Sequence, residues 1–491
     1  MTISRPLKIY FLPFFAQGHL IPLVHLARLV ASRGQHVTIL TSPSNAQLFD
    51  KIIDDDRAAG HNIRVLIFNF PSGHLGLPSG VENISAASDS HTASKIYMAA
   101  HLIKPAVDSI ISESRPDVFI PDIMFTWSAN TAKEFNLPRI VFNPISIFDV
   151  CMIEAIKAHP EAFESNSGPY KIPGLPHPLT LPVKPSPGFA SLTEALVEAE
   201  KESLGVIVNS FRELDAEYTE FYENLTGRKV WPIGPTSLMV QKTVKSSVSE
   251  EEHECLKWLS TKENGSVVYI CFGSMCTLSD EQLYELASGL ESSGHQFLWV
   301  VHRKKTNDEG EGGEDKWLPC GFEEKMKKED RGMLLKGWAP QPLILNHAAV
   351  GGFVTHCGWN ATVEAISAGV PMITMPGFGD QYYNEKLITE VHGFGVETGA
   401  AEWSISPFEP KTKVVSAERI EKAVKKLMDC GDEAERIKSK AKEVKEKAWK
   451  AVQEGGSSYN CLTELIDQLQ KLVLVAPAAA VSSHVDLEGI I

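Results

Sequence analysis

Leu7-Lys-Ile-Tyr-Phe-Leu-Pro-Phe14 and His36-Val-Thr-Ile-Leu-Thr41 are two short apolar runs near the start of the chain. After a Gly-His turn, the residues between them are apolar at the spacing of one helix face, as Ile21, Val24, Leu26, Ala27 and Val30 show. The sequence therefore predicts strand, helix and strand, which is how a βαβ unit begins.

Similar apolar runs recur along the whole chain. In the first half they cover residues 63–70, 118–121, 140–142 and 205–209, and in the second half residues 266–272, 297–301, 333–336, 350–355 and 371–375. Stretches with helical spacing, such as residues 280–292, separate several of them. This alternation predicts an α/β fold with two Rossmann-like domains, each built on a parallel sheet and facing the other across a cleft.

The chain has 491 residues, more than the ~250 to 300 that one hydrophobic core accommodates. We expect an N-terminal domain over residues 1–240, a polar and charged linker over 241–262 and a C-terminal domain over 263–455. A helix over 456–475 could pack back on the N-terminal domain, and 476–491 would form a flexible tail. Residues 304–316, rich in Gly and charge, predict a surface loop.

The composition excludes several classes of partner. With 62 acidic against 47 basic residues the net charge is -15, which disfavours nucleic acids and anionic membrane surfaces. Apolar runs stay shorter than the ~18 residues of a membrane span, and the N-terminus does not have the pattern of a secretory signal. Eight scattered cysteines without a Cys-x-x-Cys pair predict free thiols, and hence a cytoplasmic protein, which we expect to be a monomer.

Three segments carry the densest chemistry: Trp338-Ala-Pro-Gln341, Thr355-His-Cys-Gly-Trp-Asn-Ala-Thr-Val-Glu364 and Pro376-Gly-Phe-Gly-Asp-Gln381. The second joins a predicted strand to a predicted helix over residues 360–368. The N-terminus of such a helix offers unpaired N–H groups and a partial positive charge, which suit a diphosphate. His356 and Asn360 can add donors there.

The remaining residues of these segments suit the rest of a nucleotide sugar. Glu364, one helical turn after Asn360, can accept both hydroxyls of a ribose. Trp338 offers a flat face for a base, and Asp380 with Gln381 offers acceptors and donors for sugar hydroxyls. Taken singly, each of these residues could instead be a core aromatic residue, a buried histidine or part of a solvated turn. Their joint spacing favours the binding site.

Residues 338–381 resemble the 44-residue signature of plant family 1 UDP-glycosyltransferases, and the similarity extends from Phe14-Phe-Ala-Gln-Gly-His19 to Glu454-Gly-Gly-Ser-Ser458. The resemblance implies the GT-B fold and a UDP-sugar co-substrate without a further cofactor. It also implies a donor site made by Ser274, Trp338, Ala339, Gln341, His356, Trp359, Asn360, Ala361, Glu364, Asp380 and Gln381. In having Gln381 where other members have His, the chain resembles members that prefer UDP-glucose over UDP-galactose. Ala361 departs from the family, which usually has Ser there, so we expect donor binding weaker by roughly 1 kcal/mol.

His19 is the candidate general base, because an imidazole can take a proton near neutral pH and this one starts a helix after the first strand. In the family that this chain resembles, the matching His is the base and a carboxylate at a strand end orients it, here Asp122. Asp117 is the competing candidate, but it precedes the same strand and would lie at its far end. The reaction would invert the anomeric configuration and give a β-glycoside, with no metal ion. Asp54-Asp-Asp56 could suggest a cation site, although we expect a solvated turn.

The acceptor is less well defined. By the resemblance its pocket lies over N-terminal loops rich in Phe, Ile and Pro, and we expect Phe125, Phe148 and Phe378 to line it for an apolar sapogenin, flavonoid or phenolic molecule. An NAD(P)-dependent oxidoreductase is the main alternative, but Phe15-Ala-Gln-Gly-His19 has a single glycine where a dinucleotide-binding turn needs three. A non-catalytic UDP-sugar-binding protein is the second alternative.

Overall fold

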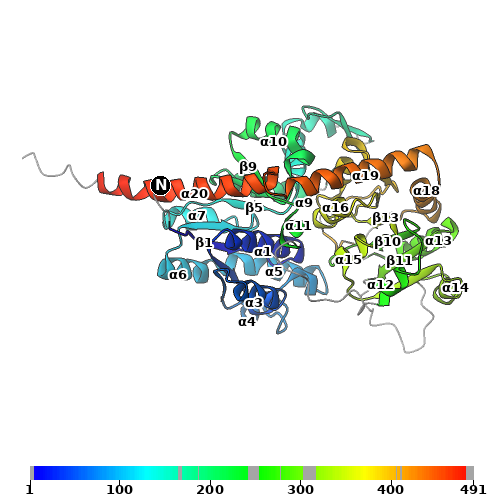
Figure 1. The fold of residues 1–491 in the computed structure, drawn as a ribbon, viewed down its shortest axis with the longest axis horizontal. Coiled ribbons are helices and arrows are strands. Elements are labelled where there is room, and N and C mark those ends of the chain that lie inside the picture. Colours follow the sequence, from blue (N-terminus) through cyan, green and yellow to red (C-terminus); the bar gives the residue numbers. More distant parts are fainter. Residues whose placement is uncertain are drawn as a thin grey trace, which may run out of the picture.

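The structure is a computed structural model that describes residues 5–163, 168–185, 187–241, 254–276, 278–301, 317–404, 406–409 and 412–482. Its two lobes lie side by side, and each contains a parallel sheet with helices on both faces (Figure 1). The predicted α/β fold with two Rossmann-like domains is confirmed. Predicted loop residues 304–316 lie outside the described residues.

The N-terminal domain is built on a sheet in the order β3-β2-β1-β4, which single bridges from Phe119 and Asp122 continue into the order β5-β8-β9. Its parallel strands are β1 (Lys8–Leu12), β2 (His36–Thr41), β3 (Ile63–Ile67), β4 (Val118–Pro121), β5 (Val141–Asn143), β8 (Gly205–Val208) and β9 (Lys229–Pro232). A small antiparallel hairpin, β6 (Tyr170–Ile172) and β7 (Leu179–Leu181), is added to it.

Most helices of this domain bury an apolar face, whereas the short α4 (Ser72–Leu75) has no buried residue. They are α1 (Gln17–Ser32), α2 (Pro43–Ala46), α3 (Asp50–Ala58), α4 (Ser72–Leu75), α5 (Ser90–Leu102), α6 (Lys104–Ser114), α7 (Ser128–Glu134), α8 (Ile147–Ala158), α9 (Pro187–Glu200), α10 (Arg212–Thr226) and α11 (Thr236–Gln241). Short 3₁₀ turns occur at Ile84–Ala86 and Pro160–Phe163. The apolar positions predicted for the first helix, among them Val24, Leu26 and Val30, are buried in α1.

The C-terminal domain contains a 6-stranded parallel sheet in the order β12-β11-β10-β13-β14-β15. Its strands are β10 (Val267–Cys271), β11 (Gln296–Val301), β12 (Gly332–Lys336), β13 (Val350–Thr355), β14 (Met372–Thr374) and β15 (Gly395–Glu397). Its helices are α12 (Glu254–Leu259), α13 (Asp280–Ser293), α14 (Phe322–Lys328), α15 (Gln341–Leu345), α16 (Trp359–Ala368), α17 (Gln381–Lys386), a π turn at Leu387–Val391, α18 (Ala417–Met428) and α19 (Asp432–Ala451).

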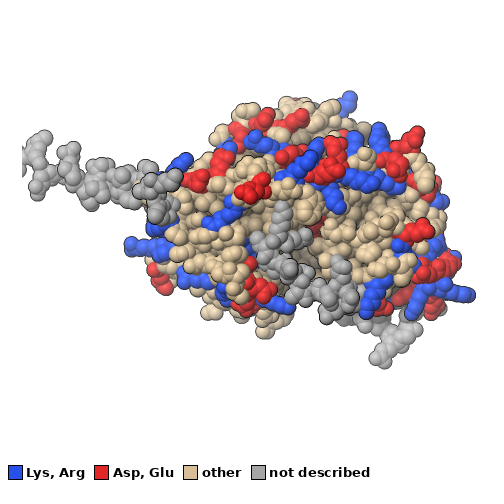
Figure 2. Space-filling model, viewed as in Figure 1, with Lys and Arg blue, Asp and Glu red and all other residues tan. Residues whose placement is uncertain are grey.

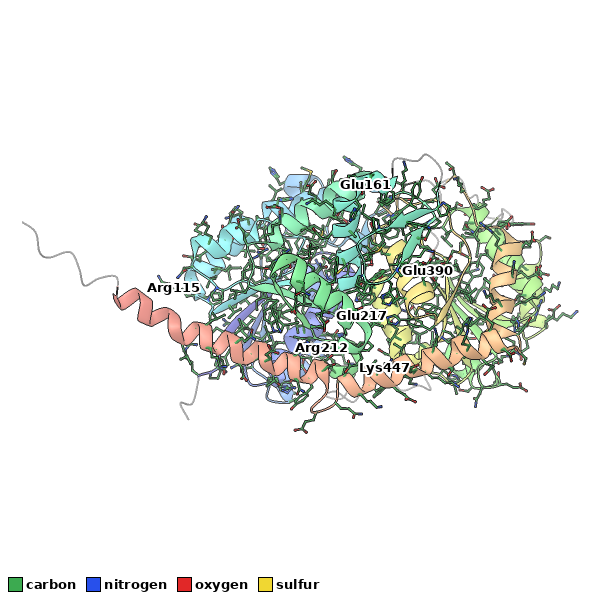
Figure 3. The ribbon with its side chains drawn as sticks, turned by 90° about the horizontal axis from the view of Figure 1, so that it is seen from above. Arg115, Glu161, Arg212, Glu217, Glu390 and Lys447 are labelled. Atoms are coloured by element: carbon green, nitrogen blue, oxygen red, sulfur yellow. The ribbon has the colours of Figure 1, made fainter. Side chains whose placement is uncertain are left out.

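Long C-terminal helices connect the two domains. Figure 3 shows α19, which carries the labelled Lys447, running past α10, which carries Arg212 and Glu217, and these two helices are in contact. Helix α20 (Ser457–Ser482) then crosses to the N-terminal domain and packs on β9 and α10 (Figure 1). At its start, Ser458 Oγ donates to Gly234 O at 2.5 Å.

Two predicted boundaries differ from the structure. Part of the expected linker is helix α12, because Cys255, Leu256 and Leu259 form a buried face, while residues 242–253 lie outside the described residues. The expected tail begins inside α20, which continues to Ser482. The rest of the tail is not among the described residues.

On the face shown in Figure 2, acidic and basic side chains are interspersed. The helices in the described part of the chain include none with the length and hydropathy of a membrane span. All eight cysteines are free thiols.

Candidate active site

His19 and Asp122 meet at the carboxyl ends of two neighbouring strands. β1 and β4 pair in parallel with Leu12 opposite Pro121, and the Asp122 N–H donates to Leu12 O at 2.9 Å. This pairing places Asp122 beside the first turn of α1, where His19 Nδ1 lies 3.0 Å from Asp122 Oδ2 and 3.1 Å from Oδ1. The Asp122 side chain is 0% exposed and that of His19 is 25% exposed, so a buried carboxylate orients a ring that solvent can reach.

Asp117 lies at the opposite end of β4 and cannot take this role. Its carboxylate pairs with Arg5 at 2.6 Å and accepts the Lys8 N–H at 2.8 Å. The carboxylate that contacts His19 is therefore Asp122.

Helix α16 presents its N-terminus between β13 and the N-terminal domain. Its first backbone bond runs from Thr362 N to Gly358 O at 3.0 Å, so the N–H groups of Trp359, Asn360 and Ala361 point out of the helix end. Three donors and a partial positive charge at one point are suited to a phosphate group. Ala361 is buried there and offers only its backbone N–H.

The ring of His356 is held between two glycines in front of this helix. A Cβ atom on Gly273 would lie 2.8 Å from His356 Cε1, and one on Gly358 would lie 2.5 Å from its Nε2. Gly273 also has φ +71°, which side chains rarely adopt. Ser274 is the next residue and is exposed in the same turn after β10. Only glycine at both positions lets the imidazole approach the helix end so closely.

Glu364 and Gln341 form a polar pair one turn along α16. Gln341 Nε2 donates to Glu364 Oε2 at 2.8 Å, and burial raises the pKa of Glu364. One carboxylate oxygen thus holds the neighbouring amide, and the other can accept further hydrogen bonds. Ala339, one residue after Trp338, packs against the core, whereas Trp338 itself is 79% exposed. An indole left largely in water offers its face to a planar ligand.

Asp380 and Gln381 stand at the start of α17. Asp380 Oδ2 accepts from Asn384 Nδ2 at 2.8 Å, and burial raises the pKa of Asp380 to about 6. Gln381 Oε1 accepts the N–H groups of Gly377 and Phe378 at 2.8 and 3.1 Å, so its carbonyl orders the preceding loop and its amide N–H groups remain for a ligand.

The sequence of this chain matches two family descriptions. Residues 6–237 match "Glycosyltransferase, N-terminal domain", and residues 200–429 match "UDP-glucoronosyl and UDP-glucosyl transferase". "UDP-glucosyl transferase 73CC6" of Saponaria officinalis is 43% identical over 96% of this chain and 98% of its own. "UDP-glucose flavonoid 3-O-glucosyltransferase 7" of Fragaria ananassa is 42% identical over 95% and 97%.

The chain belongs to the UDP-glycosyltransferase family. Solved structures of similar proteins agree with this assignment. The glycosyltransferase matches UGT73P12 of Glycyrrhiza uralensis, complexed with glycyrrhetinic acid 3-O-monoglucuronide, with TM-score 0.88, 37% identity and coverage of 98% and 100% of the two chains. TcCGT1 in complex with UDP matches with TM-score 0.77, 26% identity and coverage of 95% and 99%. The fold of this enzyme is therefore GT-B.

Trp359 is a predicted donor contact, and its backbone N–H lies at the exposed start of α16, whereas its side chain faces the N-terminal domain. The indole is buried, and its Nε1 donates to Asn209 O in the N-terminal domain at 3.0 Å. The first side chain of α16 points back toward the other domain, so it holds the two domains together.

The three predicted acceptor-pocket residues fall into different environments. Phe148 is fully buried, with its ring edge-on to Tyr218 at 4.7 Å, so it presents no surface to a pocket in this structure. Phe125 is also buried, but its ring lies 5.8 Å from that of Phe14, which in turn lies 5.2 Å from His19. Phe378 is partly buried in the loop before Asp380.

The structure adds residues that the sequence did not suggest. Phe14 packs on the His19 ring. Asn384 Nδ2 donates to Asp380 Oδ2 and also to Cys357 O, the latter at 2.9 Å. The spacing of Asn384 four residues after Asp380 on a helix was a usable signal. A cavity of about 670 Å³ also lies close by, lined by Asp89, Cys276, Pro376 and Arg419 among others, but by neither His19 nor Asp122.

The acidic run at residues 54–56 belongs to α3 and does not form the expected solvated turn. Asp56 is buried and pairs with Arg28 at 2.5 Å, and Asp54 pairs with Arg57 at 2.8 Å. These arginines supply the counter-charges that stabilise a helix here. Within the described residues, no group of three His, Cys, Asp or Glu side chains is placed to hold a metal ion.

Proposed function

We propose that this enzyme transfers glucose from UDP-glucose to a hydroxyl group of a small apolar acceptor, a sapogenin or a flavonoid or other phenolic, and produces a β-glycoside. The observation that carries the proposal is the oriented His19 imidazole directly beside the N-terminus of α16: Asn360 Nδ2 donates to Gly18 O at 2.6 Å. A base and a diphosphate site that adjoin each other are what this reaction requires.

In the proposed donor complex, uracil stacks on Trp338 next to Ala339 and Gln341. Glu364 accepts the ribose hydroxyls. The diphosphate is bound by the N–H groups at the start of α16, including that of Ala361, together with His356, Asn360 and Ser274. Asp380 and Gln381 bind the sugar. Support comes from the free carboxylate oxygen of Glu364 and from the exposed Trp338 indole.

Because Nδ1 of His19 faces the Asp122 carboxylate, it carries the ring proton, and Nε2 has the lone pair. Nε2 takes the proton of the acceptor hydroxyl while the acceptor oxygen attacks the anomeric carbon on the face opposite UDP. The bond from that carbon to the phosphate oxygen breaks, and UDP leaves with the electron pair. Asp122 stabilises the imidazolium, and the α16 N-terminus stabilises the charge on UDP without a metal ion.

The acceptor class is supported by relatives and by local composition. Relatives of this chain include the flavonoid glucosyltransferase named above and "Scopoletin glucosyltransferase" of Nicotiana tabacum, which is 39% identical. Phe14 packs on the His19 ring, and Phe15, Phe70 and Phe125 extend this aromatic cluster, so the base has apolar surroundings that are compatible with an apolar acceptor. We further propose that the enzyme is a cytoplasmic monomer, in keeping with its free thiols.

Two measurements test the proposal. UDP should raise the melting temperature of the enzyme, and NAD and NADP should not. A panel of sapogenins and flavonoids should then yield products heavier by one hexose, with β linkages by NMR. Stabilisation by NAD and not by UDP would contradict the donor assignment.

A further inference from the structure

In α1, Pro22 leaves one backbone carbonyl without its usual backbone donor. In an α-helix the N–H of a residue bonds the C=O four positions earlier, so residue 22 would bond Gly18 O. Pro22 has no N–H, and it lies inside α1. The Gly18 carbonyl is thereby open to a donor from outside the helix.

Asn360 supplies that donor from the other domain. Its Nδ2 lies 2.6 Å from Gly18 O, across 342 positions of sequence. A carbonyl oxygen only accepts hydrogen bonds, which fixes the amide with its nitrogen toward Gly18. The amide nitrogen has a second hydrogen, and Asn360 is in the first turn of α16, where the diphosphate is proposed to bind.

Gly18 is bonded directly to His19, whose Nδ1 is held by Asp122. The first turn of α1 is thus fixed at two points: Asp122 holds the ring from the N-terminal domain, and Asn360 holds the preceding carbonyl from the C-terminal domain. Without Asn360, one of these constraints on the imidazole is lost. A misplacement of about 1 Å can lower a rate on the order of 10²-fold.

We propose that Asn360 is a positioning residue for the general base: its amide bonds the Gly18 carbonyl that Pro22 leaves open, and so aligns His19 when the two domains meet around the donor. This inference rests on the proposed function, since it requires His19 to act as a base next to a diphosphate at α16. It gives Asn360 a task distinct from phosphate binding.

Trp359 provides a matched control. It occupies the same turn of α16 and also bonds the N-terminal domain, from Nε1 to Asn209 O. Asn209 follows β8, which β5 separates from β4 in the sheet, so this bond does not involve the first turn of α1. Trp359→Phe removes that bond and keeps most of the ring packing. A general loosening of the domain interface should appear in both variants, whereas a defect of the base should appear only in Asn360→Ala.

The experiment compares two acceptors that the wild-type enzyme glycosylates: an aliphatic alcohol, which needs the base, and an acidic phenol ionised at the assay pH, which does not. For Asn360→Ala we expect kcat with the alcohol to fall by about tenfold more than kcat with the phenol. Trp359→Phe should lower the melting temperature and change both kcat values by the same factor. Asn360→Leu, of similar volume, serves as the second variant if the alanine variant folds poorly.

Calorimetry with UDP alone separates the possible failures. If Asn360→Ala lowers both kcat values equally, or only weakens UDP binding, Asn360 does not position the base and the inference is overturned. If UDP does not bind the wild-type enzyme, the proposed function itself fails. A selective loss with the alcohol, at saturating donor, supports the inference.

Discussion

His19 Nδ1 and Asp122 Oδ2 lie 3.0 Å apart, although 103 positions of sequence separate the two residues. Asp122 Oδ1 also accepts the Met124 N–H at 2.9 Å, so the backbone holds the carboxylate in place independently of its contact with the imidazole. The pair has the arrangement of a base and its orienting group, and it makes the choice between the two acidic residues at β4 testable.

Asp122→Asn should lower kcat by at least about a hundredfold, because an amide neither selects the productive tautomer nor stabilises the imidazolium. His19→Ala should lose turnover to at least the same extent. Asp117→Asn is the control: it breaks the pair with Arg5 and should lower the melting temperature but leave kcat within about twofold. Undiminished turnover in His19→Ala would mean that another group takes the proton.

Glu364→Gln should weaken UDP binding by about ten- to a hundredfold, since hydrogen bonds to a charged group contribute roughly 1.5 to 3 kcal/mol. Calorimetry that compares the affinities for UDP and 2′-deoxy-UDP shows whether Glu364 binds the ribose 2′-hydroxyl. The wild-type enzyme should prefer UDP, and the variant should lose most of that preference. A preference that persists in the variant would show that the ribose hydroxyl is bound by another residue.

Ala361→Ser should strengthen donor binding. The added hydroxyl would stand at the N-terminus of α16 next to the proposed phosphates, where one hydrogen bond is worth roughly 1 kcal/mol, or about fivefold in KM for UDP-glucose. Since Ala361 is buried, melting temperatures should be compared to detect crowding. An unchanged KM in a stable variant would indicate that no phosphate oxygen reaches this position.

Donor affinity should depend on pH through Asp380. Burial raises the pKa of Asp380 to about 6, so its carboxylate is ionised above this pH. In the proposed donor complex the ionised carboxylate accepts the sugar hydroxyls. As the pH falls through about 6 the group becomes protonated, and the affinity gained from the sugar should decline. The measurement is the dissociation constant of UDP-glucose from about pH 5 to about pH 8, a range that brackets the pKa of Asp380. Asp380→Asn should bind UDP-glucose more weakly and should not show this decline in affinity as the pH falls through about 6.

Stability should depend on pH through Asp215, which is buried and accepts a hydrogen bond from Ser210. Burial raises the pKa of Asp215 from 3.8 to about 7. Between these values the unfolded chain loses the proton before the folded enzyme does, so the wild type loses stability as the pH rises. Relative to the wild type, the free energy of unfolding of Asp215→Asn should rise by on the order of 2 to 4 kcal/mol between about pH 4 and pH 7 and should not rise further above pH 7.

Urea midpoints over this pH range provide the measurement for Asp215. A stability difference that does not change with pH would mean that Asp215 is already ionised in the folded enzyme.

Several elements followed from local patterns alone. The predicted apolar runs coincide with strands β1, β2, β4, β10, β11 and β13, because a short apolar run between helical segments is typical of a buried strand. The start of α16 at Trp359 and its end at Gly369, with φ +72°, agree with the signals at residues 356–371. Strands β9 and β15 were missed because a Lys or Glu and a Pro or Gly leave neither of them a run of apolar residues.

The grouping of candidate site residues was predictable where they belong to one segment. His356, Asn360 and Glu364 share one turn and the helix that follows it, so their order along the sequence already fixes their grouping. The burial of Phe148 was not predictable, because whether an apolar side chain lines a pocket or fills the core depends on its neighbour Tyr218, 70 positions away.

The sequence by itself determined the two-domain α/β fold, the helix end that is proposed to bind the diphosphate and the histidine that follows the first strand, because all of these depend on residues within a few positions of each other. Only the tertiary structure decided that Asp122 and not Asp117 holds His19, that Trp359 bonds Asn209, and that Asn360 reaches Gly18. The physical reason is that these hydrogen bonds require strands to pair and domains to dock, and their geometry is set by packing between segments far apart in the chain.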